Sequence, residues 1–304
     1  MLAIVLALAS AIGYGGSDFA AGLASRSAPV IQITLLASAV SGLIVAATLP
    51  FAASPGPSAT ALAWGFAAGI GGTLGAFALY LGFRHAAFSV AGPLSAVAAA
   101  GFSVLAGLLY GERPTTLALT GIVLALPAIV AVSASAAAEA EAEADAPPPP
   151  QEEEEEEEAA GGLGRPVAGV VYGLVAGAFF ALLFIGLDQA GSGSGLWPVA
   201  AAAAGELAAA LVAAVAVRSF RLCGGRARLL AVITGAAGAT GTILFFVATH
   251  HGFLAITAVL TSLYPAVTIV LARVMLGERL TALRMGGLVT AGACVTLIAL
   301  GGAS

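Results

Sequence analysis

The stretches Tyr-Gly-Glu-Arg-Pro-Thr at 110–115 and Leu-Gly-Glu-Arg-Leu-Thr at 276–281 are two copies of one motif, 166 positions apart. The same shift aligns His85 with His251, and it aligns apolar residues on both sides of the motif. These are Leu105, Ala106, Leu117, Gly121 and Val123, which align with Leu271, Ala272, Leu283, Gly287 and Val289. A shared tripeptide alone would be weak evidence, but a motif with matching flanks in each half predicts an internal duplication.

The composition of the chain indicates a membrane protein. Hydrophobic residues make up 60% of the 304 residues and charged residues 9%, with a mean hydropathy of +1.04. Ordinary soluble domains carry about 25% charged residues. Apolar runs of about 20 residues, the length that crosses a bilayer as a helix, follow one another with short connections. Because these runs lack the alternation of barrel strands, we predict an all-α, multi-pass integral protein of the cell membrane.

The apolar runs and the residues that interrupt them predict ten transmembrane helices. They cover about 2–24, 30–52, 60–82, 88–110, 115–134, 166–188, 196–217, 229–249, 253–275 and 282–301. Residues 136–164 hold 11 of the 16 acidic residues and four consecutive prolines, which predicts a solvated, disordered linker. This linker separates a first five-helix repeat, 1–135, from a second, 165–304. Because five is odd, the second repeat must cross the membrane in the opposite sense, giving two inverted repeats.

The chain resembles the drug/metabolite transporter superfamily, and within it the proteins with two EamA-type repeats. The resemblance rests on the two Gly-Glu-Arg motifs, on Tyr264-Pro265-Ala266, and on Tyr-Gly-Gly-Ser-Asp-Phe at 14–19. It covers nearly the whole chain except the acidic linker, which is not part of the family pattern. The resemblance implies ten helices, a central cavity between the halves, and transport of small molecules driven by an ion gradient or by exchange. It does not imply a particular substrate.

The distribution of arginine predicts an orientation in the membrane. The loops that join odd-numbered to even-numbered helices hold nearly all the arginines, whereas the opposite face holds only Arg113. The positive-inside rule therefore places these loops and the acidic linker in the cytoplasm and both termini outside. The family resemblance implies instead that both termini are cytoplasmic, so the orientation stays open.

Two ionisable residues within apolar helices are the leading candidates for function, because charged groups at membrane depth are rare and costly. Asp18 lies near the end of the first span, after Tyr14 and Ser17, and we predict a substrate or proton contact there. The alternative is a helix-end carboxylate paired with Arg26. Glu206 lies in the middle of the seventh span among alanines and leucines. It is either a proton-coupling group that faces the cavity or a neutral carboxyl group hydrogen-bonded to a neighbouring helix.

Two prolines indicate where more of the cavity lining lies. Pro93 and Pro265 are predicted to interrupt the fourth and ninth spans, and a proline frees backbone carbonyls that can face a cavity. The polar and aromatic residues near these prolines are predicted to line it: Ser95, Thr261, Ser262 and Tyr264. Tyr80 on the third span is a further candidate for the wall, with core packing as the alternative.

The other polar residues are predicted to have structural roles. Glu112 and Glu278 are predicted to cap helix ends, because an acidic group is favourable at a helix N-terminus. His85, His250 and His251 follow the third and eighth spans and are predicted to lie at helix ends near the interface. The sequence contains no phosphate loop, nucleophile elbow or metal-ligand spacing, so we expect no cofactor, no bound metal and no enzymatic activity.

Together these features predict a secondary transporter that moves a small polar or amphipathic metabolite by alternating access, with export as the expected direction. Its expected partners are the small-molecule substrate, membrane lipids and coupling protons, with exchange as the alternative to proton coupling, and no nucleic acid. Two other functions stay open. The protein could flip a lipid-linked substrate through a cavity that opens sideways, or it could be a scaffold or regulator that recruits a partner through the acidic linker.

Overall fold

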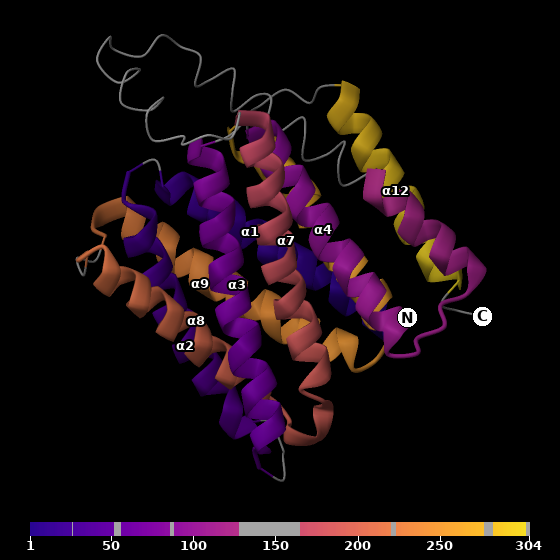
Figure 1. The fold of residues 1–304 in the computed structure, drawn as a ribbon, viewed down its shortest axis with the longest axis horizontal. Helices are drawn as coiled ribbons and strands as arrows, with labels where there is room; N and C mark the ends of the chain where they lie inside the picture. The colour runs from indigo at the N-terminus through magenta and orange to yellow at the C-terminus, as the bar shows by residue number, and fades with distance from the viewer. Residues whose placement is uncertain are drawn as a thin grey trace.

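The computed structural model describes residues 1–25, 27–51, 56–85, 88–127, 165–219, 223–276 and 282–301 (Figure 1). Within these ranges the chain forms helices and turns, with no strand. The helices are α1 (Leu2–Ser25), α2 (Val30–Thr48), α3 (Ala59–His85), α4 (Phe88–Leu109), α7 (Arg165–Gln189), α8 (Trp197–Ala216), α9 (Gly225–Thr249), α10 (Leu254–Thr261), α11 (Tyr264–Leu276) and α12 (Ala282–Gly301). Short 3-10 helices at Leu49–Phe51 and Ser192–Ser194 follow α2 and precede α8. A further apolar helix, Thr116–Pro127, follows α4.

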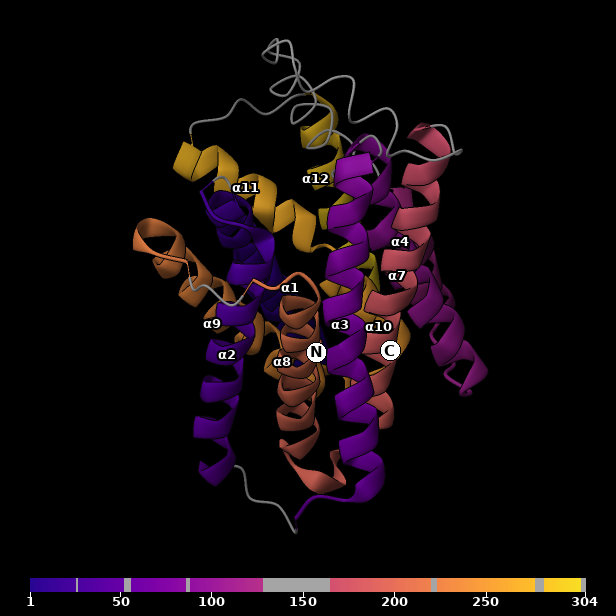
Figure 2. The same ribbon diagram turned by 60° about the vertical axis from the view of Figure 1, so that its left-hand side comes forward.

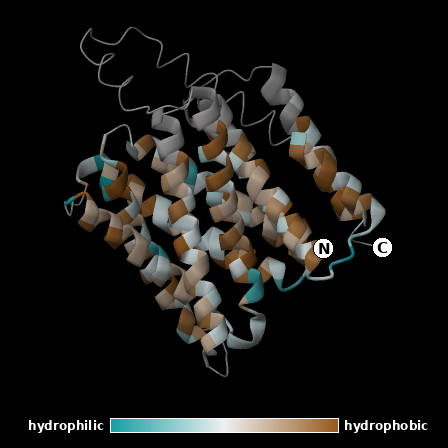
Figure 3. Ribbon diagram, viewed as in Figure 1, coloured by the Kyte–Doolittle hydropathy of each residue, from teal (hydrophilic) through white to brown (hydrophobic). Residues whose placement is uncertain are grey.

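Six helical segments in the described part of the chain are long and apolar enough to cross a membrane. They are Leu2–Ser25, Val30–Phe51, Ala59–Leu79, Val170–Gln189, Trp197–Ala216 and Gly225–Thr249. Figure 3 shows hydrophobic residues along the coloured helices of the bundle, and large apolar side chains such as Leu43 and Val212 are 71% and 70% exposed. Such a surface is typical of a protein in lipid, because soluble monomers rarely expose large contiguous apolar patches. The prediction of an all-helical, multi-pass membrane protein is therefore confirmed.

Helices that precede the acidic linker pack mainly on helices that follow it. α1 lies against α9, α10 and α11, α2 against α8 and α9, α3 against α7 and α8, and α4 against α7 and α10. Figures 1 and 2 both show α3 beside α7. The two largest apolar clusters combine residues from both sides of the linker: one contains Ile4 and Leu260, and the other Val45 and Phe245. The two parts of the chain therefore share one core.

Glycines permit the closest contacts between these helices, and the contacts recur at the spacing of the sequence motif. A Cβ atom added at Gly75 would lie 3.2 Å from the carbonyl oxygen of Ala176, and one added at Gly241 would lie 3.3 Å from that of Ser10. Positions 75 and 241 differ by 166, and so do positions 10 and 176. The contact of α3 with α7 and the contact of α9 with α1 thus use positions that correspond under the shift of 166.

A second pair of glycines brings backbones even closer. A Cβ atom added at Gly69 on α3 would lie 1.9 Å from the carbonyl oxygen of Ala202 on α8. One added at Gly235 on α9 would lie 2.3 Å from the carbonyl oxygen of Ala37 on α2. Positions 69 and 235 again differ by 166. Only glycine leaves room for such direct backbone contact, which is a common packing device between membrane helices.

The two prolines predicted to interrupt spans differ in their effect. α10 ends at Thr261 and α11 begins at Tyr264, so the ninth span is broken as predicted. Pro265 is the second residue of α11, where the backbone nitrogen has no partner within the helix in any case. By contrast, α4 runs without a break through Pro93, and the prediction of an interruption there is wrong. Pro93 lies close to the start of α4, so it removes a single backbone hydrogen bond near a helix end.

Candidate functional site

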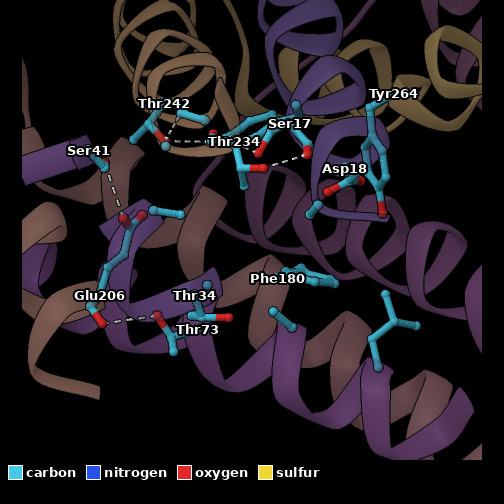
Figure 4. A pocket seen from close by; sticks show the side chains of 18 of the residues that line it. Ser17, Asp18, Thr34, Ser41, Thr73, Phe180, Glu206, Thr234, Thr242 and Tyr264 are labelled. Carbon is cyan, nitrogen blue, oxygen red and sulfur yellow. Dashed lines mark hydrogen bonds between the residues drawn. The ribbon is translucent and has the colours of Figure 1, made fainter. Parts of the chain in front are cut away.

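A cavity of about 470 Å³ lies among the helices, a size that accepts a small molecule. Its lining includes Ser41, Thr73 and Glu206 in the middle of α2, α3 and α8. It also includes Ser25, the last residue of α1, and Val30, the first residue of α2. The cavity thus runs from the middle of the bundle toward the face at which α1 ends. Figure 4 shows part of its lining from close by.

One wall of the cavity is the polar stretch of α1. The Tyr14 hydroxyl shares a hydrogen bond of 3.0 Å with the Thr242 hydroxyl, and the Ser17 hydroxyl donates to the carbonyl oxygen of Thr234 at 3.0 Å. Asp18 is exposed to the cavity. Among the residues that the structure describes, none forms a hydrogen bond or an ion pair with its carboxyl group; Arg26, the predicted alternative partner, lies outside them. Two of the three polar side chains on this wall are therefore held by α9, and the third is left available.

A second carboxyl group approaches the cavity from α8. The Ser41 hydroxyl donates to Glu206 Oε2 at 3.3 Å, and the Thr73 hydroxyl donates to the backbone carbonyl oxygen of Glu206 at 3.4 Å (Figure 4). The Glu206 side chain is half-buried. The Glu206 side chain lines the cavity and is also hydrogen-bonded to a neighbouring helix, so both predicted alternatives for Glu206 stay predictions.

The cavity brings together most of the residues predicted to form it. Tyr14, Ser17, Asp18, Ser95, Glu206 and Tyr264 all line it. Thr261 and Ser262 do not, although both are fully buried. Thr261 does not line the cavity because its hydroxyl points toward α1, where it donates a hydrogen bond to the carbonyl oxygen of Ala7 at 3.3 Å. The side chain of Tyr80 lies outside the described residues.

Other lining residues were not predicted from the sequence. They include Thr34, Ser38, Thr73, Thr234, Thr242 and Thr268, with Phe180 and Phe184 on α7. Single threonines and serines in an apolar helix carry little signal, since their hydroxyl groups often bond to their own helix. Phe180 and Phe184 could have been found, because they lie 166 positions after Tyr14 and Asp18.

Hydrogen bonds link helix ends at the opposite face of the bundle. Glu112, between α4 and the next helix, accepts hydrogen bonds from the backbone N–H groups of Leu254 and Ala255. The prediction that Glu112 caps a helix end is confirmed, and the helix is α10. Burial raises the pKa of Glu112 and nearby Asp188 raises it further, while the two backbone hydrogen bonds oppose that shift. Glu278, the equivalent residue, lies outside the described residues.

A second polar link lies at the same face. Asp188, near the end of α7, accepts hydrogen bonds from the hydroxyl of Thr249 at the end of α9 and from Gln189 Nε2, the latter at 2.9 Å. His250 directly follows α9, and its Nδ1 lies 2.7 Å from the carbonyl oxygen of Phe246. The predicted helix-end position of His250 is therefore confirmed. These contacts lie at the end of the bundle away from the cavity.

Three comparisons with known proteins bear on the identity of the chain. Residues 1–134 match the EamA-like transporter family. A solved crystal structure is similar over 96% of this chain and 96% of its own, with a TM-score of 0.69 and 17% sequence identity. It is described only as the crystal structure of a protein, and at this identity the similarity shows the fold alone. A search of curated proteins found no match.

The family match falls on the part of the chain that contains Tyr14, Asp18 and the first Gly-Glu-Arg motif. It confirms the resemblance that those residues predicted. Residues 1–134 are therefore similar to the EamA-like transporter family, and the chain is a multi-pass integral membrane protein.

Proposed function

We propose that this protein is a secondary transporter that carries a small polar or amphipathic metabolite by alternating access. The cavity is the observation that carries the proposal. It holds Glu206 near the middle of the bundle and Asp18 nearer the end of α1, and it reaches one face, while apolar packing and the links at Glu112 and Asp188 join the helices at the other face. An alternating-access transporter has this shape in one of its two states. The EamA-like match of residues 1–134 supports the same function.

The proposed mechanism needs two related halves, which we propose to be ten helices in two inverted repeats, 1–135 and 165–304. The helix contacts support this arrangement. Exchanging the halves turns the contact of α1 with α9 into that of α7 with α3, and the contact of α2 with α9 into that of α8 with α3. The glycine contacts at a spacing of 166 agree with it. Ser41 and Glu206, which share a hydrogen bond, are 165 positions apart and so would lie near the axis that relates the halves.

Export is the proposed direction. The cavity reaches the face at which α1 ends, and this is also the face that the distribution of arginine assigns to the cytoplasm. A cavity in this state would load solute from the cytoplasm. Asp18 and Glu206 are the proposed coupling groups, because a carboxyl group within a membrane bundle can take up a proton in one state and release it in the other.

Reconstitution into liposomes tests the proposal. Purified full-length protein would be given a panel of labelled metabolites, with and without a pH gradient, beside liposomes that contain no protein. We expect saturable flux of at least one solute, accelerated by the gradient. In Asp18→Asn and Glu206→Gln, gradient-driven acceleration should be lost. Proton-linked flux that survives both substitutions would show that the assignment of Asp18 and Glu206 as coupling groups is wrong. A lack of flux for every solute would reject the proposed transport function.

Deleting residues 136–164 separates transport from a scaffold function. A transporter should keep its flux without the linker, whereas a scaffold that recruits partners through these acidic residues would lose its function. Fluorescent lipid in the same liposomes tests the remaining alternative, since protein-dependent movement of a lipid between leaflets would favour a flippase.

A further inference from the structure

The two equivalent walls of the cavity differ in chemistry. Tyr14 and Asp18 of α1 line the cavity, and so do Phe180 and Phe184 of α7, the residues 166 positions further along the chain. The Tyr14 and Phe184 rings lie 6.4 Å apart between centroids. If the halves are duplicates, equivalent positions carry a phenol and a carboxyl group on α1 but two phenyl rings on α7. A site built in this way suits a ligand with one polar end and one apolar end.

The polar end of that ligand must be compatible with two acidic groups. Asp18 and Glu206 are the only ionisable carboxyl groups in the lining, and no arginine or histidine is among the lining residues within the described ranges. The sequence has no lysine at all. Carboxylates act strongly on a nearby charge where the surroundings are apolar, because the local dielectric constant is far below that of water. An anion would therefore be repelled, and a cation attracted.

The two carboxyl groups are not equally available to a ligand. Glu206 already accepts a hydrogen bond from Ser41, and its backbone carbonyl accepts one from Thr73. Asp18 is exposed to the cavity and forms no hydrogen bond or ion pair with any residue that the structure describes. Tyr264 lines the cavity on the same side of the view as Asp18, and Phe180 lies below them (Figure 4). Aromatic faces also attract cations, so these rings favour the same ligand charge as Asp18 does.

We infer that the transported solute is an organic cation with an aromatic or similarly apolar body. Its ammonium group binds at Asp18, and its body packs against Tyr14 and Phe180. The inference rests on the proposed transport function, and it narrows the substrate class of the same cavity from any polar or amphipathic metabolite to amphipathic amines.

A set of phenyl compounds that differ in charge tests this inference. The probes are 2-phenylethylamine, 2-phenylethanol and 3-phenylpropanoate, which carry positive, zero and negative charge on similar bodies at neutral pH. Binding to full-length protein in detergent is measured by calorimetry. We expect the amine to bind at least tenfold more tightly than the alcohol and the acid to bind more weakly still. Equal binding of the acid and the amine, as would follow if Arg26 neutralised Asp18, would overturn the inference.

Substitutions of the lining residues test which of them contact the charged and apolar parts of the probe compounds. Asp18→Asn should weaken binding of the amine at least tenfold and leave binding of the alcohol within a factor of three, because only the charge contact is lost. Glu206→Gln removes the other carboxyl group and should have a smaller effect on the amine. Phe180→Ala should weaken amine and alcohol alike. A preference for the amine that persists in Asp18→Asn would contradict the assignment to Asp18, whether or not the other variants fold.

Counterflow in liposomes separates the inference from the function on which it rests. Liposomes loaded with an unlabelled amine, acid or alcohol are diluted into the labelled compound. Uptake of the amine, and not of the acid, supports both the transport function and the proposed substrate class. Uptake of acids without amines would keep the transporter and reject its substrate class. No protein-dependent uptake of any compound, including the metabolite panel, would reject the transporter itself.

Discussion

Gly69→Ala tests the packing of α3 against α8 by adding one methyl group. The added Cβ atom would lie 1.9 Å from the carbonyl oxygen of Ala202, whereas real Cβ atoms stay at least 3.0 Å from such atoms. The two groups must therefore separate by about 1.1 Å. Both belong to the backbone, so no side-chain rotation can relieve the contact, and the two helices must move apart.

The expected loss of stability follows from that displacement. Overpacking of a well-filled core costs about 1–3 kcal/mol. Replacing glycine by alanine also favours the helix by about 1 kcal/mol. Gly42→Ala on α2 isolates the steric part, because a Cβ atom added at Gly42 meets no atom within 4 Å. Both variants gain helix propensity, so Gly69→Ala should be less stable than Gly42→Ala by about 1–3 kcal/mol.

Reversible unfolding in mixed micelles with rising SDS measures the difference between the two variants. Wild-type protein and Gly235→Ala, the equivalent position on α9, complete the set. Gly235→Ala should lose stability in the same range, since its added Cβ atom would lie 2.3 Å from the carbonyl oxygen of Ala37. If Gly69→Ala proves as stable as Gly42→Ala, α3 and α8 do not make the backbone contact described here.

The remaining predictions concern the face opposite the cavity opening and the orientation. Glu112→Ala leaves two backbone N–H groups of α10 without an acceptor and should lower the free energy of unfolding by about 0.5–2 kcal/mol. Because the folded pKa of Glu112 is raised above its unfolded value, its protonated form favours folding. Wild-type stability should therefore fall as pH rises through that pKa, whereas Glu112→Gln should lack this component; a pH series of the same unfolding assay decides. Thr249→Val removes a hydroxyl donor from Asp188 and should cost about 1–3 kcal/mol. Thr240→Val should cost less, because the exposed Thr240 loses only a hydrogen bond to its own helix. A cysteine placed in 136–164 should resist an impermeant thiol reagent in intact cells, because the predicted orientation puts these residues in the cytoplasm. Labelling in intact cells would show that the orientation is the opposite one. Cys223 and Cys294 are buried and should contribute little to the labelling.

Much of the fold could be predicted because the sequence carries one motif twice, at a fixed spacing. The shift of 166 found around Gly111 and Gly277 is the shift at which the helix contacts of Gly75 and Gly241 correspond. The composition alone predicts an all-helical membrane protein, since apolar runs of this length have few other solutions. The break between α10 and α11 was visible at Pro265, which lies in the first turn of α11, whereas α4 continues through Pro93, where the proline removes one backbone hydrogen bond without ending the helix.

The candidate site could be predicted only where a residue was unusual for its surroundings. Asp18 and Glu206 stand out in apolar helices, and both line the cavity. Thr261 and Ser262 were wrongly expected to line it, because sequence proximity to Tyr264 does not give the direction of a side chain near a helix break. Phe180 was missed since a phenylalanine in a membrane helix is ordinary, and its role emerges only from the repeat.

The central claim is that two related halves enclose one path that opens to each face in turn. Thr34 on α2 lines the open cavity, and Ala200 on α8, 166 positions later, packs instead on the apolar cluster that contains Phe245. Each would be replaced by cysteine in reconstituted protein and treated with an impermeant thiol reagent from either side, at rest and during flux. We predict that Thr34→Cys reacts only from the face at which α1 ends, and that Ala200→Cys reacts only from the opposite face and only during turnover. Reaction of both cysteines from the same face, or an Ala200→Cys that stays unreactive while solute crosses, would contradict the account.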